Sequence, residues 1–154
     1  MDILEIFPSV ISWVADQQLW ARSLGRPLVQ EEVKWARSVG VEKLENVRVL
    51  EVEDFPRPSS SQLVALMSEY GFLGPDTDGI TYGYSILIRR GKSNCRLLSH
   101  EFRHVYQYEQ YGSIENFLAH YLTQIVEVGY EKSALEIDAR KHELQDDNLP
   151  NSNR

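Results

Sequence analysis

The chain has 154 residues, of which 42% are hydrophobic and 25% are charged, and its formal net charge is −7. This length and composition predict one globular domain over residues 1–145, followed by a disordered polar tail over residues 146–154. The acidic excess argues against nucleic acid as the main partner, because phosphate contacts need surplus Lys and Arg.

The sequence also bears on the compartment. It has no run of about 18 apolar residues that could cross a membrane, and its first residues, MDILEIFPSV, lack the basic segment and cleavage site of a signal peptide. The single cysteine, Cys95, cannot form an internal disulfide. We therefore expect a cytoplasmic protein without a membrane partner, in which any metal site uses His, Asp or Glu.

Hydrophobic spacing predicts two helices in the N-terminal part of the chain. Ser9 is a suitable cap for the first helix, whose apolar residues continue to a stop at Gly25. The second helix is expected to open at Arg26 and Pro27 and to end at Gly40. We expect the three tryptophans to lie in the core of these helices: Trp13, Trp20 and Trp35.

Two strands and a short helix are predicted next. Residues 46–55 alternate as a strand does, and residues 62–70 form a short helix that ends at Gly71. Residues 80–91, ITYGYSILIRRG, have the strongest strand pattern, with large apolar residues at alternate positions. As an edge strand it could bind an extended peptide, with Gly83 allowing a close approach; the alternative is a core strand with a bulge at that glycine.

The C-terminal half is predicted to be helical. One helix runs from about Arg96 to Gln110. A second is capped by Ser113 and closed by Gly129, and a third, ALEIDARKHEL, is capped by Ser133. This order of elements predicts an α+β fold with N-terminal helices, a small sheet and a helical C-terminal half.

The first of these three helices contains an HExxH motif. Residues four apart lie on one helix face, so His100 and His104 can direct two imidazoles at one metal ion. Glu101, about 100° further around the helix, is suited to accept a proton from a water molecule. The motif therefore predicts Zn²⁺ with Glu101 as general base. The alternative is two solvated histidines on a surface helix, which the flanking apolar residues disfavour.

A catalytic zinc takes three protein ligands, and the residues alone leave the third open. His120 is expected to face water. Glu136 also completes a capping box with Ser133, in which its carboxylate would bond to the backbone at the start of the helix instead of to a metal. The candidates near the C-terminus are three acidic residues and one histidine: Glu131, Glu136, Asp138 and His142.

The segment HEFRHVYQYEQYGSIENFLAHYL, followed by GYEKSALEIDAR, resembles the small bacterial zincin-like proteins of the gluzincin type. In that family an HExxH helix, a connecting helix and a glutamate helix form a metallopeptidase site. The resemblance covers about residues 79–140 and implies a zincin-like metallopeptidase domain that acts on a peptide or protein. It implies that His100, His104 and Glu136 bind Zn²⁺, with Asp138 as the next choice for the third ligand.

This resemblance has one departure. Larger gluzincins place a carboxylate one turn after the ligand glutamate to orient a histidine, and Arg140 stands at that position here. Asp138 or a backbone carbonyl would then have to orient the histidine. Arg103 is expected to pair with the glutamate helix; the alternative is a solvated charge.

Peptide hydrolysis also needs a donor for the developing oxyanion. Tyr130 is our candidate, ahead of Gln107 and Tyr111, which share the helix face of the two histidines. A chain of this size leaves little material for a deep cleft, which favours an alternative: a catalytically weak or inactive metal-binding or regulatory module. A further alternative is a metal-dependent hydrolase that cleaves another kind of amide.

Overall fold

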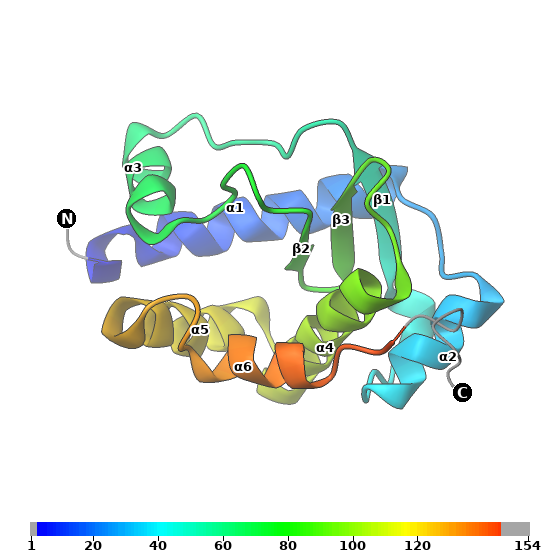
Figure 1. Cartoon of the computed structure of the whole chain (residues 1–154). Coiled ribbons are helices and arrows are strands. Elements are labelled where there is room, and N and C mark those ends of the chain that lie inside the picture. The colour runs from blue at the N-terminus through cyan, green and yellow to red at the C-terminus, as the bar shows by residue number, and fades with distance from the viewer. Residues whose placement is uncertain (1–2, 146–154) are drawn as a thin grey trace.

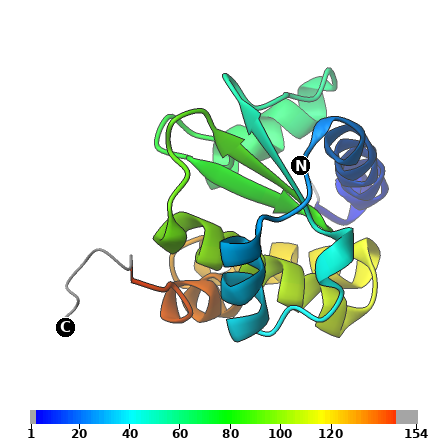
Figure 2. The same cartoon turned by 90° about the vertical axis from the view of Figure 1, so that its right-hand side faces the viewer.

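The computed structural model describes residues 3–145 and shows a small sheet with helices on both of its faces (Figures 1 and 2). The predicted α+β class is confirmed. The predicted tail, residues 146–154, lies outside the described residues. Within the described part, none of the helices combines the length and hydropathy that crossing a bilayer requires.

The sheet has the strand order β1-β3-β2, with β1 at Arg48–Val52, β2 at Gly79–Tyr82 and β3 at Ser85–Arg89. β1 pairs with β3 in parallel, and β2 pairs with β3 antiparallel. The single strand predicted over residues 80–91 is therefore wrong: it is a hairpin. Gly83 has φ +66° at the first position of the two-residue turn, a conformation that favours glycine.

This turn changes which side chains share a face of the sheet. Ile80 pairs with Leu87, and both belong to the apolar cluster that includes α1. Ile86 and Ile88 belong to the other cluster, on the opposite face. The expected single apolar row is therefore divided between two cores. Of the two hairpin strands, β2 lies at an edge of the sheet and β3 at its centre, and Gly83 lies in the turn, neither in an edge strand nor at a bulge.

Helix α1 (Ile3–Leu24) starts earlier than predicted, so Ser9 lies inside it and does not cap it. After Gly25, α2 (Gln30–Ser38) begins beyond Val29 and not at Pro27, because residues 25–29 contain an extended segment whose Arg26 bonds to Val49 of β1. Gly40 follows α2 with φ +108°, as a helix stop does.

The three tryptophans differ in environment. Trp13 meets Tyr82 edge-on, with ring centroids 5.5 Å apart, and Trp35 packs against the cluster on the α2 side. Trp20 is 40% exposed, so its predicted place in the core is wrong. A short 3₁₀ helix, η1 (Leu44–Asn46), leads from α2 to β1.

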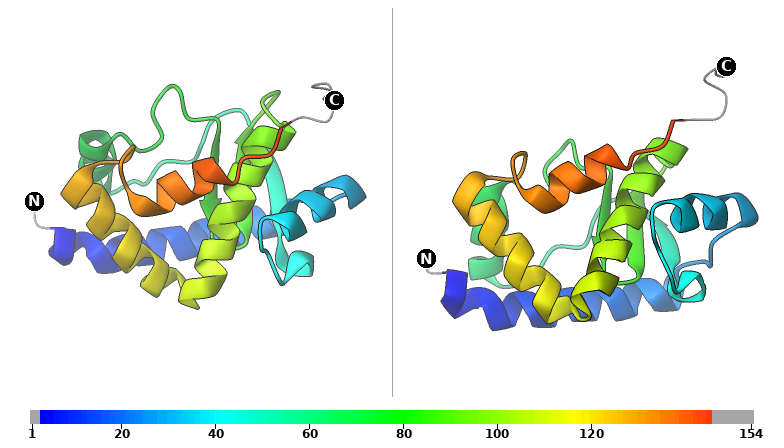
Figure 3. Two further views of the ribbon diagram at one scale, coloured as in Figure 1. Left: turned by 60° about the horizontal axis from the view of Figure 1, so that its bottom comes forward. Right: turned by 90° about the horizontal axis from the view of Figure 1, so that it is seen from below.

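The remaining helices lie where the sequence predicts them, although the last one ends at Lys141 and not at Leu144 as ALEIDARKHEL predicted. They are α3 (Ser61–Tyr70), α4 (Cys95–Tyr111), α5 (Ile114–Val128) and α6 (Ala134–Lys141). Side chains of Ser113 and Ser133 cap α5 and α6 as expected, and Gly71 ends α3 with φ +75°. Seen from below, α6 lies beside α4, and α5 leads away from the C-terminal end of α4 (Figure 3).

Two apolar clusters hold the layers together. The first joins α1, α3, α5 and one sheet face, and the second joins α2, α4 and the other face. Phe102 and Val105, both fully buried, fix α4 in the second cluster, while Tyr108 reaches the first. The burial of these side chains sets the rotation of α4 and directs its histidine face toward α6.

Candidate metal centre

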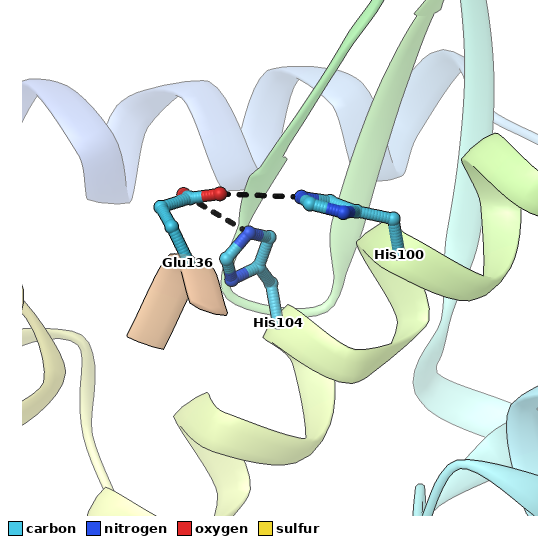
Figure 4. A group of neighbouring side chains, drawn as sticks. All are labelled: His100, His104 and Glu136. Carbon is cyan, nitrogen blue, oxygen red and sulfur yellow. Dashed lines mark hydrogen bonds and ion pairs between the residues drawn. The ribbon is translucent and has the colours of Figure 1, made fainter. Parts of the chain in front are cut away.

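His100, His104 and Glu136 converge from two helices, and Figure 4 shows their side chains pointing at one another. The Nε2 atom of His100 lies 3.2 Å from Oε1 of Glu136, and Nε2 of His104 lies 3.2 Å from Oε2. One potential ligand atom from each residue lies within 4.8 Å of the other two. The structure thus brings together the three residues that the resemblance implies as metal ligands.

Glu136 does not form the alternative capping box. Ser133 caps α6 by accepting the backbone N–H of Glu136 on its Oγ at 3.4 Å. The backbone N–H of Ser133 bonds to the carbonyl of Tyr130, while the Glu136 carboxylate turns to the histidines. The cap therefore fixes the first turn of α6 and leaves the Glu136 side chain available to the cluster.

Gln107 orients His104. Its amide nitrogen donates to Oδ2 of Asp138 and to the carbonyl of Leu135, both at 2.9 Å, so its oxygen is the atom that faces His104. That oxygen lies 2.8 Å from Nδ1 of His104 and accepts its proton. In the neutral imidazole, which is the form that binds a metal, the lone pair is then on Nε2, the atom that faces Glu136. Asp138 thus acts on the histidine through Gln107.

Glu143 orients His100 in the same way, and the sequence analysis missed it. Its Oε2 lies 2.8 Å from Nδ1 of His100, so Nε2 again faces Glu136. Glu143 lies just beyond α6, seven residues after Glu136, and a spacing of two helical turns was the available signal. Arg140 is exposed and donates to the carbonyl of Glu131 instead.

The other candidate ligands have different partners. Asp138 is held by Arg103, whose Nε donates to its Oδ2 at 2.8 Å, which confirms the predicted pairing of Arg103 with this helix. His142 bonds through Nδ1 to the carbonyl of Asp138. His120 is exposed and bonds to the carbonyl of Asn116, and Glu131 is exposed. None of these candidates belongs to the three-residue cluster.

Glu101 is 4% exposed and lies between α4 and the edge strand β2. Oγ1 of Thr81 donates to its Oε1 at 2.7 Å, and Thr81 is itself buried. On the other side, a Cβ at Gly79 would lie 3.2 Å from Oε2, so the absence of a side chain at Gly79 makes room for that oxygen. The edge strand therefore sets the position of both carboxylate oxygens.

The cluster is electrostatically coupled. Burial alone would lower the pKa of His104, but the Glu136 carboxylate outweighs burial and raises it to about 9. The pKa of His100 is raised by the hydrogen bond to Glu136 and the nearby Glu101 charge, against the effect of burial. Burial opposes ionisation of Glu136, yet the two imidazoles hold its pKa well below its usual range. A carboxylate thus faces two nitrogens, an arrangement that suits a divalent cation.

Two tyrosines lie at the cluster, one of them unforeseen. Tyr121 of α5 donates its hydroxyl to Oε2 of Glu136 at 2.7 Å. Tyr130, the predicted oxyanion donor, is 41% exposed and lines a cavity that His100, His104 and Glu136 also line. Burial, together with the charges of Glu136 and Glu101, raises its pKa and keeps the phenol protonated. Tyr111 instead stacks on His120, with ring centroids 4.4 Å apart.

A cavity of about 930 Å³ opens in front of the cluster. Its lining includes His100, Glu101, His104, Tyr130 and Glu136, together with residues of α1, α3 and α5. This volume is within the upper part of the range of roughly 300–1,000 Å³ that is usual for ligand sites. The expectation that the chain is too short to build a deep cleft is therefore wrong.

Comparison of this chain with models of protein families, with curated proteins and with solved structures found no match. The likeness of residues 79–140 to zincins thus stays a hypothesis, supported by the motif and by the geometry of the cluster.

Proposed function

We propose that the protein is a zinc-dependent metallopeptidase of the gluzincin type, with a zincin-like domain that hydrolyses peptide bonds. The observation that carries this proposal is the convergence of two Nε2 atoms and one carboxylate, from His100, His104 and Glu136, at the wall of a large cavity. A peptide or protein substrate and a cytoplasmic location belong to the same proposal.

The donor set fits zinc better than other common cations. Two imidazole nitrogens and one carboxylate oxygen are a known ligand set of catalytic zinc, whereas Mg²⁺ and Ca²⁺ prefer oxygen ligands. The outer nitrogens of His100 and His104 are bonded to Glu143 and Gln107, which is the support that zinc-binding histidines require. Glu136 is only 1% exposed, and burying a carboxylate is costly unless a cation compensates it.

When bound, Zn²⁺ supplies a Lewis acid that polarises a carbonyl and makes water a nucleophile near neutral pH. Glu101 accepts a proton from the attacking water and then delivers it to the nitrogen of the leaving amine. Because Thr81 bonds to Oε1, we assign Oε2 as the oxygen that carries the proton. The protonated phenol of Tyr130 is the proposed donor to the developing oxyanion.

The alternative is a zincin fold that only binds metal and acts as an interaction module. Such a module needs neither a buried carboxylate beside the ligands nor a cavity, and the protein has both, in Glu101 and in the 930 Å³ space. These two features favour the enzyme.

Zinc content and turnover test the proposal together. We expect about one zinc per chain in the wild type, loss of zinc in His104→Ala and Glu136→Gln, and no loss in His120→Ala, which removes an exposed histidine. Glu101→Gln should keep its zinc and lose cleavage of a mixed peptide library. Absence of zinc after reconstitution, or full activity of Glu101→Gln, would contradict the proposal.

A further inference from the structure

The cavity extends from the cluster of His100, His104 and Glu136 to an apolar region lined by residues of α1, α3 and α5. We call this region the apolar chamber and define it by six lining residues: Trp13 of α1, Leu66 and Met67 of α3, Phe72 after α3, and Leu118 and Leu122 of α5. All six are apolar, and they come from segments far apart in the sequence.

The chamber shares a wall with the cluster. Tyr121 bonds through its hydroxyl to Glu136, and its ring centroid lies 6.2 Å from that of Phe72. The centroid of the Tyr121 ring also lies 6.3 Å from that of the His104 ring. A group in the chamber is therefore about one side chain away from the metal ligands.

Charged residues also line the cavity outside the six residues of the chamber. Lys92 and Arg96 lie near the N-terminal end of α4, which Figures 1 and 3 show away from α3 and α5, and Asp76 and Asp78 lie in the loop between α3 and β2. A charged side chain in the chamber would lose its water without gaining a partner among the six residues that define it, which is unfavourable. A bulky apolar side chain would bury its surface there at no such cost.

We propose that the substrate has a bulky apolar side chain (Leu, Met, Phe or Trp) at a residue flanking the bond that is cleaved, and that this side chain binds in the apolar chamber. This inference rests on the proposed function, and it assigns Met67 and Phe72 as residues that determine specificity. Burial of such a side chain should favour its peptides about 10- to 100-fold over alanine peptides.

The first test uses quenched fluorescent peptides and the zinc-loaded protein, with one position varied at a time. We expect kcat/KM at one flanking position to be at least about tenfold higher for Leu or Phe than for Ala, and lowest for Asp. Cleavage without any apolar preference would overturn the inference and leave the proposed function intact. Cleavage of no peptide would overturn the proposed function.

Binding gives a readout that does not depend on turnover. With Glu101→Gln, calorimetry should show tighter binding of peptides that contain Leu or Phe than of their Asp counterparts. Equal affinity for both would overturn the inference even if the enzyme proved inactive.

Variants of α3 locate the preference. Met67 is partly buried and lines the chamber, whereas Val64 on the same helix is 44% exposed and does not line the cavity. Met67→Glu should lower kcat/KM for the best apolar peptide about tenfold or more and favour peptides with Lys, with zinc content unchanged. Val64→Glu should change neither kcat/KM for the apolar peptide nor the preference among peptides.

A second substitution guards against misfolding of the charged variant. Met67→Trp keeps the chamber apolar and narrows it, so the preference should move from Phe toward smaller residues such as Leu or Val. The same peptide profile in Met67→Trp and in wild type would overturn the assignment of Met67.

Discussion

Thr81 and Glu101 form a buried pair in which the threonine hydroxyl donates to the carboxylate at 2.7 Å. The two residues come from different elements, the edge strand β2 and the helix α4. The strand therefore determines the rotamer of the residue that we propose as general base.

Replacing Thr81 by Val keeps the shape of the side chain and removes the donor. Because a hydrogen bond to a charged group contributes about 1.5–3 kcal/mol, we expect kcat to fall about tenfold or more, with KM and zinc content unchanged. Thr81→Ser restores the hydroxyl and should recover most of kcat. If Val and Ser variants lose activity equally, the hydroxyl does not position Glu101.

Substitution of Gly79 tests whether catalysis depends on the position of the other carboxylate oxygen, Oε2 of Glu101. In Gly79→Ala the new Cβ would lie 3.0 Å from Cδ1 of Ile88 and 3.2 Å from Oε2 of Glu101, so one of them has to move. We expect kcat to fall about tenfold while zinc stays bound, since a small misplacement of a reacting group is costly. At Gly74 the nearest atom, the Gly71 carbonyl oxygen, would be 3.8 Å from a Cβ. Gly74→Ala should therefore leave kcat unchanged; a similar loss there would refute the steric explanation.

Glu143 is predicted to affect metal affinity although it is not a proposed ligand. Glu143→Ala removes the acceptor for Nδ1 of His100, and loss of such a partner weakens zinc binding about 10- to 100-fold. Competition with a chromophoric chelator measures this change. Glu127→Ala, at an exposed position of α5, is the matched control and should bind zinc as the wild type does.

The coupling of His104 to Glu136 predicts how the stability of the metal-free protein depends on pH. The pKa of His104 is raised from 6.5 to about 9 in the folded chain, so its stabilising effect is complete below about pH 6.5 and lost as the pH rises through 9. We expect the free energy of unfolding in the presence of EDTA to decrease by on the order of 2 kcal/mol over this interval.

Denaturant titrations of the metal-free protein at several pH values check this prediction. His104→Ala removes the titrating group and should flatten the profile between pH 6.5 and 9. Zinc binding should depend on pH in the opposite direction to stability, because binding requires the neutral imidazole and releases a proton. The affinity of the protein for zinc should therefore rise with pH between 6.5 and 9. A constant affinity would contradict the conclusion that His104 of the metal-free protein loses its proton only near pH 9.

The cluster of His100, His104 and Glu136 was predictable because its determinants are local. The spacing of His100 and His104 puts both on one helix face, and Ser133 marks the start of the helix that presents Glu136. The local sequence pattern could not decide whether Glu136 is a ligand or a capping residue, because this depends on how α6 packs beside α4. Glu143 was missed for a related reason: the predicted helix ALEIDARKHEL includes it two turns after Glu136, but only the packing of α6 beside α4 brings its carboxylate to His100.

The hairpin and the cleft were harder to predict. Gly83 and Tyr84 interrupt the strand pattern for only two residues, and the apolar alternation continues across the turn, so the run looks like one strand. Part of the cavity wall comes from α1 and α3, which lie far from α4 in the sequence. Only tertiary packing brings these surfaces opposite the metal cluster.

The connection from β1 to β2 has a consequence for how this molecule can diversify. It leaves and re-enters the sheet at the same end, because Val52 pairs with Arg89 and Gly79 with Ile88, and it contains α3, whereas β2 itself carries the chain back to the start of β3. Lengthening or shortening this connection would resize the cleft while β2, β3 and α4 keep their pairing. Closing a longer loop costs little, only about 0.6 kcal/mol for each doubling of length. In the proposed peptidase, variation in this connection would therefore alter the choice of substrate without altering the groups that carry out the reaction.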